Sequence, residues 1–220
     1  MIIVMLGAPG SGKGTVGSLL SENFRIPHIS SGEIFRSYIK KHNDLGKELE
    51  QYVVSGNLVP DELAIRIVEK RLSEEDVVNG FILDGYPRTK NQAIELDELL
   101  KNNNKKIKVA ANLSLPDEEI IERIINRRTC TNVSCRQIYN LQYKPPREEG
   151  VCDNCGSKLI LRKDDNEETI RQRLKVYHEA SKDLIHYYKE KDILYTLKVN
   201  QESKKTTEDI AEEINKHVRR

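Results

Sequence analysis

Short runs of apolar residues alternate along the chain with longer stretches of helical periodicity. The apolar runs are residues 2–7, 80–84, 108–115 and 192–199. Runs of this length without polar alternation are typical of parallel strands that are buried on both faces. Between them, apolar residues recur at helical spacing in residues 61–72, 92–100, 117–127 and 167–188. The alternation predicts an α/β fold with a mainly parallel sheet covered by helices on both faces.

Two segments interrupt this alternation. Residues 30–59 are helical in pattern but punctuated by glycine, and residues from about 127 to 165 contain two prolines, all the cysteines and little periodicity. Because each segment starts and ends beside an expected core element, we interpret both as insertions at the edge of one α/β core. A chain of 220 residues with 37% hydrophobic residues can fill a core of that size.

Charge is nearly balanced, with 36 basic and 35 acidic residues and a net charge of +1. Nucleic-acid and membrane-surface binders carry an excess of positive charge, so we expect neither kind of partner. Any bound anion must therefore be held by a local site. The longest apolar run, residues 1–6, is too short for a signal sequence or a membrane span. This favours the cytoplasm, where thiols stay reduced.

The first chemical motif is GAPGSGKGT, residues 7–15, directly after the first expected strand. Its glycines let successive backbone N–H groups turn inward and form a nest for phosphate oxygens, with the Lys13 ammonium alongside. The motif predicts a nucleoside-triphosphate site; the alternative is a glycine-rich turn that binds nothing. Gly14 separates Lys13 from Thr15, whereas the strict pattern has Ser or Thr right after the lysine. A direct hydroxyl ligand for magnesium is therefore left open.

The second motif is FILDGYPRT, residues 81–89. Asp84 ends an expected buried strand, where it could hold magnesium through water, although an ordinary turn acid would also fit there. Gly85 allows a second ligand to approach the backbone, and Arg88 can pair with a phosphate. Gln92 has two interpretations, because Thr89 and Gln92 also have the spacing of a helix capping box.

The four cysteines form two pairs, Cys130-x4-Cys135 and Cys152-x2-Cys155, with 16 residues between the pairs. In a reducing compartment this spacing predicts a structural zinc site of the zinc-ribbon type, because four thiolates complete a tetrahedron and leave no open position for catalysis. The alternatives are a metal-free reduced or disulfide-linked state, or another soft metal such as iron.

Seven motifs, in this order along most of the chain, resemble the long-lid form of adenylate kinase. They are GAPGSGKGT, HISSGEIFR, GNLVPDEL, NGFILDGYPRT, IIERIINRR, YNLQYKPP and RKDDNEETIRQRL. The resemblance implies a P-loop nucleoside monophosphate kinase with a five-stranded parallel sheet, whose extra strand would lie near residues 26–30. It implies reversible phosphoryl transfer from Mg-ATP to AMP, giving two ADP. It also implies a core of residues 1–29, 60–125 and 166–220, an AMP-binding insertion at 30–59 and a zinc-binding lid at 126–165.

The resemblance assigns site residues position by position. The ATP site would comprise Gly10, Ser11, Gly12, Lys13, Gly14, Thr15, Arg127, Ile138 and Tyr139. The AMP site would comprise Ser31, Arg36, Asn57, Leu58, Val59, Gly85, Tyr86, Pro87, Arg88, Gln92, Arg162 and Arg173, with Gln92 reading the adenine. Catalysis would rest on Lys13, Asp84, Arg88, Arg123, Arg127, Arg162 and Arg173. ATP, AMP and ADP would be the partners of a monomer, with Mg²⁺ and a structural Zn²⁺ as cofactors.

Three positions depart from the family pattern. The first cysteine pair is wider than the usual Cys-x2-Cys, Asn200-Gln201 replaces the usual Asp-Gly near the adenine of ATP, and Ser31 replaces the commoner threonine. Because of Ser31, a kinase with a pyrimidine acceptor or GTP as donor stays as an alternative. Because of the zinc ribbon, a nucleic-acid-binding module with a vestigial nucleotide site stays as a second one. The lid residues 127–165 have eight basic and five acidic residues. Their net charge of +3 falls to +1 with a zinc tetrathiolate, which favours a nucleotide over a polymer.

Overall fold

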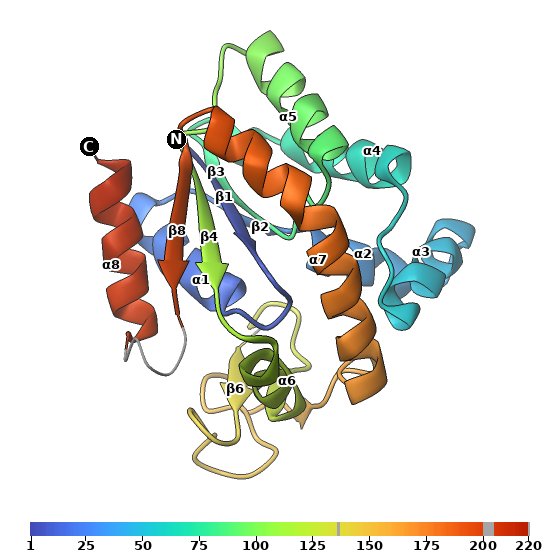
Figure 1. The fold of residues 1–220 in the computed structure, drawn as a ribbon. Helices are drawn as coiled ribbons and strands as arrows, with labels where there is room; N and C mark the ends of the chain where they lie inside the picture. The colour runs from blue at the N-terminus through green and yellow to red at the C-terminus, as the bar shows by residue number, and fades with distance from the viewer. Residues whose placement is uncertain (136, 200–204, 220) are drawn as a thin grey trace.

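The computed structural model describes residues 1–135, 137–199 and 205–219. A five-stranded sheet runs through the centre in the order β2-β3-β1-β4-β8, and every neighbouring pair is parallel (Figure 1). The strands are β1 (Ile2–Gly7), β2 (His28–Ser30), β3 (Phe81–Asp84), β4 (Val109–Ser114) and β8 (Leu194–Lys198). The predicted fold class, including the weak strand near residues 26–30, is therefore confirmed.

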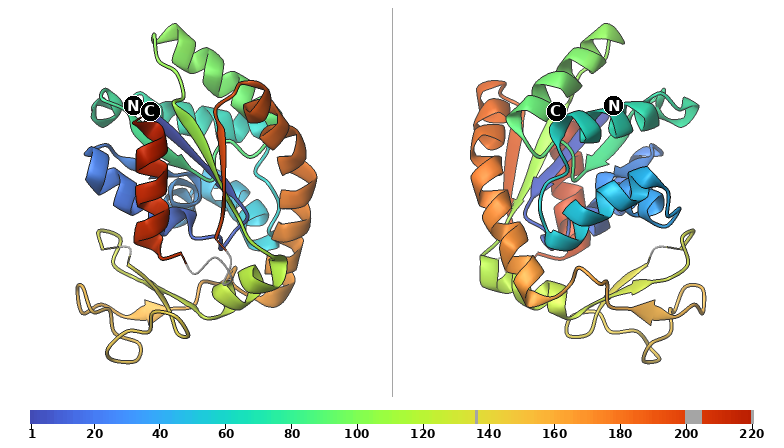
Figure 2. Two further views of the ribbon diagram at one scale, coloured as in Figure 1. Left: turned by 60° about the vertical axis from the view of Figure 1, so that its left-hand side comes forward. Right: turned by 90° about the vertical axis from the view of Figure 1, so that its right-hand side faces the viewer.

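Helices cover both faces of this sheet. They are α1 (Lys13–Phe24), α2 (Ser31–Ile39), α3 (Asp44–Ser55), α4 (Asp61–Leu72), the 3-10 turn η1 (Glu75–Val77), α5 (Lys90–Asn102), α6 (Asp117–Ile125), α7 (Glu167–Glu190) and α8 (Thr207–Val218). Figure 2 shows α1 and α8 on one face and α4, α5 and α7 on the other. None of the described helices combines the length and apolar character needed to cross a membrane.

Strand β1 explains why the first apolar run has no polar alternation. Ile3 and Met5 pack in the core under α1 and α8, whereas Ile2 and Val4 pack in the core under α4, α5 and α7. Both faces of a central parallel strand are covered, so every position must be apolar. Beside β1, Met5 pairs with Asp84 of β3, and this register places Asp84 next to the loop that follows β1.

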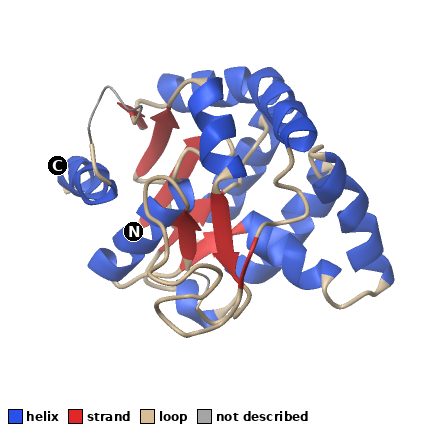
Figure 3. Cartoon of the chain, turned by 90° about the horizontal axis from the view of Figure 1, so that it is seen from below, coloured by secondary structure: helices blue, strands red, loops and turns tan. Residues whose placement is uncertain are grey.

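The segment that was predicted to form a lid folds into a small antiparallel sheet, in the order β6-β5-β7. Its strands are β5 (Arg127–Cys130), β6 (Ile138–Asn140) and β7 (Leu159–Ile160). The helix predicted over residues 117–127 ends earlier, at Ile125, and that part of the prediction is wrong. Arg127 instead opens β5 opposite Asn140, because pairing across the lid outweighs the local helical pattern. Figure 3 views the molecule from this lid side.

Candidate active site

The residues predicted to bind nucleotides meet in one cleft at the carboxyl ends of the parallel strands, where ligands of open α/β sheets bind. The cleft has a volume of about 1210 Å³. Its lining includes Gly10, Ser11, Gly12, Lys13, Gly14, Thr15, Arg36, Asn57, Leu58, Val59, Asp84, Gly85, Tyr86, Pro87, Arg88, Gln92, Arg123, Arg127, Ile138, Tyr139, Arg162 and Arg173. Of the predicted nucleotide-binding residues, Ser31 is buried and does not line the cleft, and its hydroxyl donates to the Gly85 carbonyl at 2.7 Å.

The loop between β1 and α1 has the shape of a phosphate nest. Gly12 caps α1 with a φ of 92° and offers no side chain to cap the N–H groups of the first helical turn. Gly10 has a φ of +81°, and a Cβ atom there would lie 2.6 Å from Ile124. Both positions therefore require glycine. The free N–H groups and the positive end of the helix dipole are available to an anion.

Lys13 folds back over this loop. Its Nζ donates to the carbonyls of Gly7 and Ala8 at 2.8 and 2.7 Å. Burial lowers the pKa of Lys13 to about 8, although the nearby Asp84 carboxylate acts in the opposite direction. Carbonyl contacts compensate an ammonium less well than a phosphate does, so a bound nucleotide offers Lys13 better partners.

Asp84 ends β3 beside the phosphate loop, as predicted. Burial would raise the pKa of this carboxyl group, but His28, Lys13 and Arg88 together hold the pKa below its ordinary value. The His28 Nε2 atom lies 3.5 Å from Asp84 Oδ2. A carboxylate that stays ionised next to the phosphate loop fits a hydrated magnesium ion. His28 opens the motif HISSGEIFR, but the sequence analysis gave it no role, because no local spacing connects it to Asp84.

Arginines from different elements surround the same cleft. They are Arg36 on α2, Arg88 after β3, Arg123 on α6, Arg127 on β5, Arg162 in the lid and Arg173 on α7. Desolvation, followed by repulsion from Arg173, lowers the pKa of Arg88 to about 10. Desolvation, followed by repulsion from Arg127 and Arg36, lowers the pKa of Arg162 to about 9. Cations that destabilise one another in this way are relieved by a bound polyanion.

Two aspartates that the sequence analysis missed balance part of this charge. Arg127 pairs with Asp165, and Arg173 pairs with Asp164. Both carboxylates lie just before α7. Asp165 is 38 residues from Arg127 in the sequence, and Asp164 is 9 residues from Arg173. The available signal was the acidic pair in RKDD, which lies between two predicted phosphate-binding arginines.

The side of the cleft that was predicted to bind AMP contains Gln92, which is buried at the start of α5. Thr89 caps this helix by accepting from the Gln92 backbone N–H at 3.1 Å, so the first half of the predicted capping box is present. The Gln92 side chain takes other partners: it accepts from the Arg88 N–H at 2.8 Å and donates to Asp61 at 2.7 Å. The side-chain half of the capping box is therefore replaced by the bond to the Arg88 N–H, and the base-reading role of Gln92 stays a prediction.

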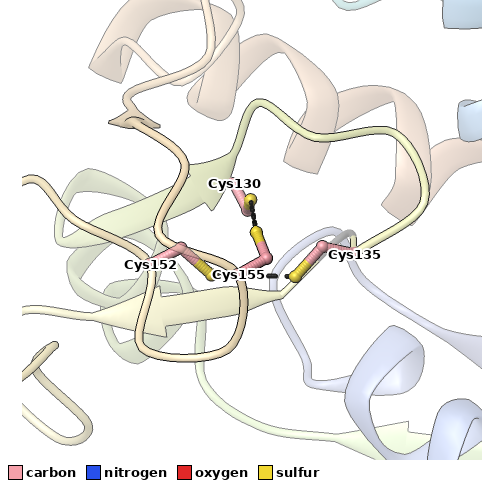
Figure 4. Close-up of side chains that lie close together, drawn as sticks. All are labelled: Cys130, Cys135, Cys152 and Cys155. Carbon is pink, nitrogen blue, oxygen red and sulfur yellow. Dashed lines mark hydrogen bonds between the residues drawn. The ribbon is translucent and has the colours of Figure 1, made fainter.

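The four cysteines converge in the lid (Figure 4). All four Sγ atoms lie within 4.8 Å of one another; Cys130 and Cys155 are 3.5 Å apart, and Cys135 and Cys152 are 3.7 Å apart. Thiolates at about 2.3 Å from a tetrahedral zinc lie about 3.8 Å from one another, so the cluster fits that ion despite the wide first pair. Among the described residues the cysteines are not linked by disulfides.

Beside this cluster, Tyr139 is buried on β6, and its hydroxyl accepts from the Asp153 N–H at 2.8 Å. Tyr139 also lines the cleft, so the cysteine cluster and the cleft are connected through one side chain. On the opposite edge, Arg123 donates to the Val199 carbonyl at 3.0 Å. The departure Asn200-Gln201, which follows Val199, lies outside the described residues, as does Arg136 of the lid.

A cleft that gathers this much positive charge around a phosphate nest is suited to move a phosphoryl group between nucleotides. The fold and the site together define a P-loop nucleotide kinase. A family model described as adenylate kinase matches residues 5–193. The chain belongs to the adenylate kinase family, which confirms the resemblance predicted from its motifs.

Curated relatives named adenylate kinase span nearly the whole chain. The protein of Caldicellulosiruptor bescii is 48% identical over 210 residues, covering 96% of this chain and 97% of the relative. That of Clostridium tetani is 48% identical over 211 residues, with the same coverage. That of Clostridium botulinum strain Hall is 50% identical over 194 residues, covering 88% and 89%. Membership of this family makes the protein an enzyme of the nucleoside monophosphate kinase class.

Proposed function

We propose that this chain transfers the γ-phosphoryl group of Mg-ATP reversibly to AMP, giving two ADP, with the residues of the cleft in the roles given below. One observation carries the assignment: the phosphate nest at Lys13 and the buried amide of Gln92 line the same cleft, with the arginine cluster around them. A phosphate donor and a purine acceptor can therefore approach each other within a lining of positive charge.

The donor nucleotide binds with its phosphates on residues 10–15. Lys13 leaves its carbonyl partners for the β and γ phosphates, and Arg123 and Arg127 contribute charge from α6 and β5. Ile138 and Tyr139 line the nucleotide on the lid side. When bound, Mg²⁺ neutralises the donor phosphates, and Asp84 would hold it through water.

The acceptor nucleotide binds between α2, α3 and the loop after β3. Gln92 reads the base, whereas Arg36 and Arg88 hold the phosphate. The remaining contacts come from Asn57, Leu58, Val59, Gly85, Tyr86 and Pro87 along this wall. Ser31 contributes indirectly, because it is buried behind the cleft surface and its hydroxyl donates to the Gly85 carbonyl.

The chemistry needs no protein nucleophile. An oxygen of the AMP phosphate attacks the γ-phosphorus, the bond to the bridging oxygen of ADP breaks, and negative charge spreads over the equatorial oxygens of the transferred group. Lys13, Arg88, Arg162 and Arg173 supply preorganised positive charge for those oxygens. A closed lid over residues 126–165 excludes water, which would otherwise take the phosphoryl group.

The cysteine cluster would hold a structural zinc that makes the lid rigid. The described buried cluster of the lid contains only Cys130, Tyr139, Cys152 and Leu159, which is a small core. A metal can supply the stability that such a core lacks. Rigidity matters because the lid carries Arg162 and Tyr139 to the nucleotide. We also propose a cytoplasmic monomer, as the family resemblance implies. Nucleic-acid partners are not expected, since the balanced net charge of +1 favours a local anion site.

The test is phosphoryl transfer by the purified protein from Mg-ATP to AMP, GMP, CMP or UMP, each offered separately. Rapid ADP formation with AMP alone is the expected result. Preference for a pyrimidine acceptor would mean that the residues of the acceptor site are wrongly assigned, while the assignment of the donor site remains valid. Absence of transfer to all four acceptors, together with salt-dependent binding of RNA or DNA, would overturn the proposal.

A further inference from the structure

The side-chain amide of Gln92 is held at both ends. Its Oε1 accepts from the backbone N–H of Arg88 at 2.8 Å, and its Nε2 donates to Oδ1 of Asp61 at 2.7 Å. The residue is only 2% exposed, although it lines the cleft. A primary amide has two N–H donors and two acceptor lone pairs. These two bonds therefore leave one N–H and one lone pair for a ligand.

The two protein partners determine which way the amide points. The backbone N–H of Arg88 can only donate, and a carboxylate at Asp61 can only accept. Turning the amide by 180° would set two donors against each other at Arg88 and two oxygens against each other at Asp61. Both bonds would be lost in a buried position, where unpaired polar groups are costly. Gln92 consequently has one favourable orientation.

Asp61 is itself held in place by neighbours other than Gln92. It is the first residue of α4, and its Oδ2 accepts from the Thr89 hydroxyl at 2.8 Å and from the Asn91 amide at 3.2 Å. Its two carboxylate oxygens thus bind different partners. Oδ2 ties α4 to the start of α5, whereas Oδ1 bonds to Gln92.

We propose that Asp61 is a specificity-determining positioning residue, which fixes the Gln92 amide in the orientation that accepts adenine and rejects 6-oxopurines. Adenine presents a donor at its 6-amino group and an acceptor at N1, which match the free lone pair and the free N–H of the fixed amide. Hypoxanthine and guanine present the reverse, an acceptor at O6 and a donor at N1. They could bond to Gln92 only if the amide turned over, and Asp61 opposes that turn.

This inference rests on the proposed role of Gln92 as the residue that reads the acceptor base. AMP and IMP are the sharpest pair of probes, because hypoxanthine exchanges the two hydrogen-bonding groups without the added bulk of guanine. Asp61→Asn is the main variant, since it keeps the volume of the side chain and its amide can turn to accept or to donate. Asp61→Ala removes the acceptor of the Gln92 hydrogen bond altogether.

The experiment measures kcat/KM with AMP and with IMP, at saturating Mg-ATP, for the full-length enzyme and its variants. In Asp61→Asn we expect the AMP-to-IMP ratio to fall about tenfold, by the loss of one charge-assisted hydrogen bond. The change should lie in KM for the acceptor, with KM for ATP unchanged. A merely structural role for Asp61 would not move the ratio of two acceptors that share one site.

Glu62→Gln is the matched control. It removes an acidic charge from an exposed position next to Asp61 and leaves the hydrogen-bond partners of Asp61 and Gln92 in place, so the ratio should stay at its wild-type value. If Asp61→Asn is folded and keeps the wild-type ratio, the inference is wrong while the proposed function stands. If the wild-type enzyme does not prefer AMP, the proposed function fails first. Should Asp61→Ala melt below the assay temperature, the isosteric variant alone decides.

Discussion

Arg127 and Asp165 form a bidentate ion pair where the lid meets the core. Nε of Arg127 donates to Oδ2 of Asp165 at 2.8 Å, and Nη2 donates to Oδ1. The Asp165 side chain is fully buried, and that of Arg127 is 17% exposed. Arg127 opens the lid strand β5, and Asp165 closes the lid just before α7. The pair therefore ties the two ends of the lid together and occupies an arginine that we assign to ATP.

The first prediction concerns that carboxylate. Asp165→Asn leaves Arg127 and Arg173 without their shared negative charge in a region that also contains Arg36 and Arg162. Breaking a buried pair from one side costs about 3 kcal/mol, so the melting temperature of the free enzyme should fall clearly. ATP should raise the melting temperature of the variant more than that of the wild type, because its phosphates replace the lost charge.

Thermal unfolding with and without ATP checks this expectation. Asp44→Asn is a suitable control, since Asp44 is fully exposed and its ion pair with Lys47 lies in solvent. That variant should melt as the wild type does. An Asp165→Asn enzyme with an unchanged melting temperature would show that the ion pair between Arg127 and Asp165 contributes nothing to the stability of the free enzyme.

The second prediction separates catalysis from folding at Arg88. Its guanidinium lies in the cleft, where Nε donates to the Gly85 carbonyl at 2.9 Å, whereas its backbone N–H bonds to Gln92. Arg88→Ala removes the charge and keeps the backbone bond. Loss of one arginine at a transferring phosphoryl group costs about 10³-fold in kcat.

Steady-state kinetics and thermal melting of the same preparation test this point. We expect the large loss of kcat with little change in melting temperature. Arg66→Ala, at an exposed position of α4, serves as the matched control and should keep wild-type turnover. Comparable turnover in Arg88→Ala would remove Arg88 from the catalytic set.

The third prediction is a pH dependence that arises from Lys13. Because burial lowers its pKa to about 8, the ammonium is charged below that pH and loses its proton above it. The kcat/KM for Mg-ATP reports the free enzyme, so it should decline above about pH 8 as Lys13 becomes neutral. In Lys13→Arg the charge persists, and the residual activity should show no decline with that midpoint.

The same group affects stability with the opposite sign. Between about pH 8 and the ordinary lysine pKa of 10.5, the unfolded chain binds the proton and the folded chain does not. Stability from this group therefore increases with pH in that window, since the cost of burying the charge is removed. Parallel pH profiles of activity and of melting should diverge above pH 8. If both fall together, alkaline unfolding and not Lys13 limits the activity.

The sequence predicted the core well because burial on both faces leaves a local signal. Strand β1 and helix α4 lie where the apolar patterns indicated, and Gly10 and Gly12 of the predicted phosphate loop both have a positive φ. Helix α8 was not predicted, although Thr206 and Asp209 form a capping box that could have marked its start.

Features that depend on remote pairing could not be predicted in this way. Arg127 follows a helical pattern yet lies in β5, because its partner Asn140 is brought opposite it by the lid turn. Asp61 lies 31 residues from Gln92, and Asp165 lies 38 residues from Arg127. No local pattern connects such residues. The sequence thus indicated the groups that we assign to phosphate and base more readily than the carboxylates that hold those groups in position.

The last prediction concerns the lid metal. If zinc supplies most of the lid's stability, a chelator that removes one zinc per chain should loosen residues 126–165 and leave the parallel sheet folded. Hydrogen exchange offers a local readout, because two backbone hydrogen bonds lie within the cluster. In them the Cys130 N–H donates to the Gln137 carbonyl at 3.0 Å, and the Cys152 N–H donates to the Ser157 carbonyl at 2.9 Å. These amides should lose protection, whereas Val4 and Ile82 in the sheet should keep it.

Cys152→Ser tests the same point without a chelator. Cys152 is buried in the small lid core, so its loss should reduce bound zinc and lower the melting temperature. Ser134→Ala, next to the predicted ligand Cys135 in an exposed turn, should retain the metal and the melting temperature. Metal content by mass spectrometry must be measured on each sample. A metal-free enzyme with wild-type exchange at Cys130 and Cys152 would mean that the small core and the lid strands hold the lid without the ion.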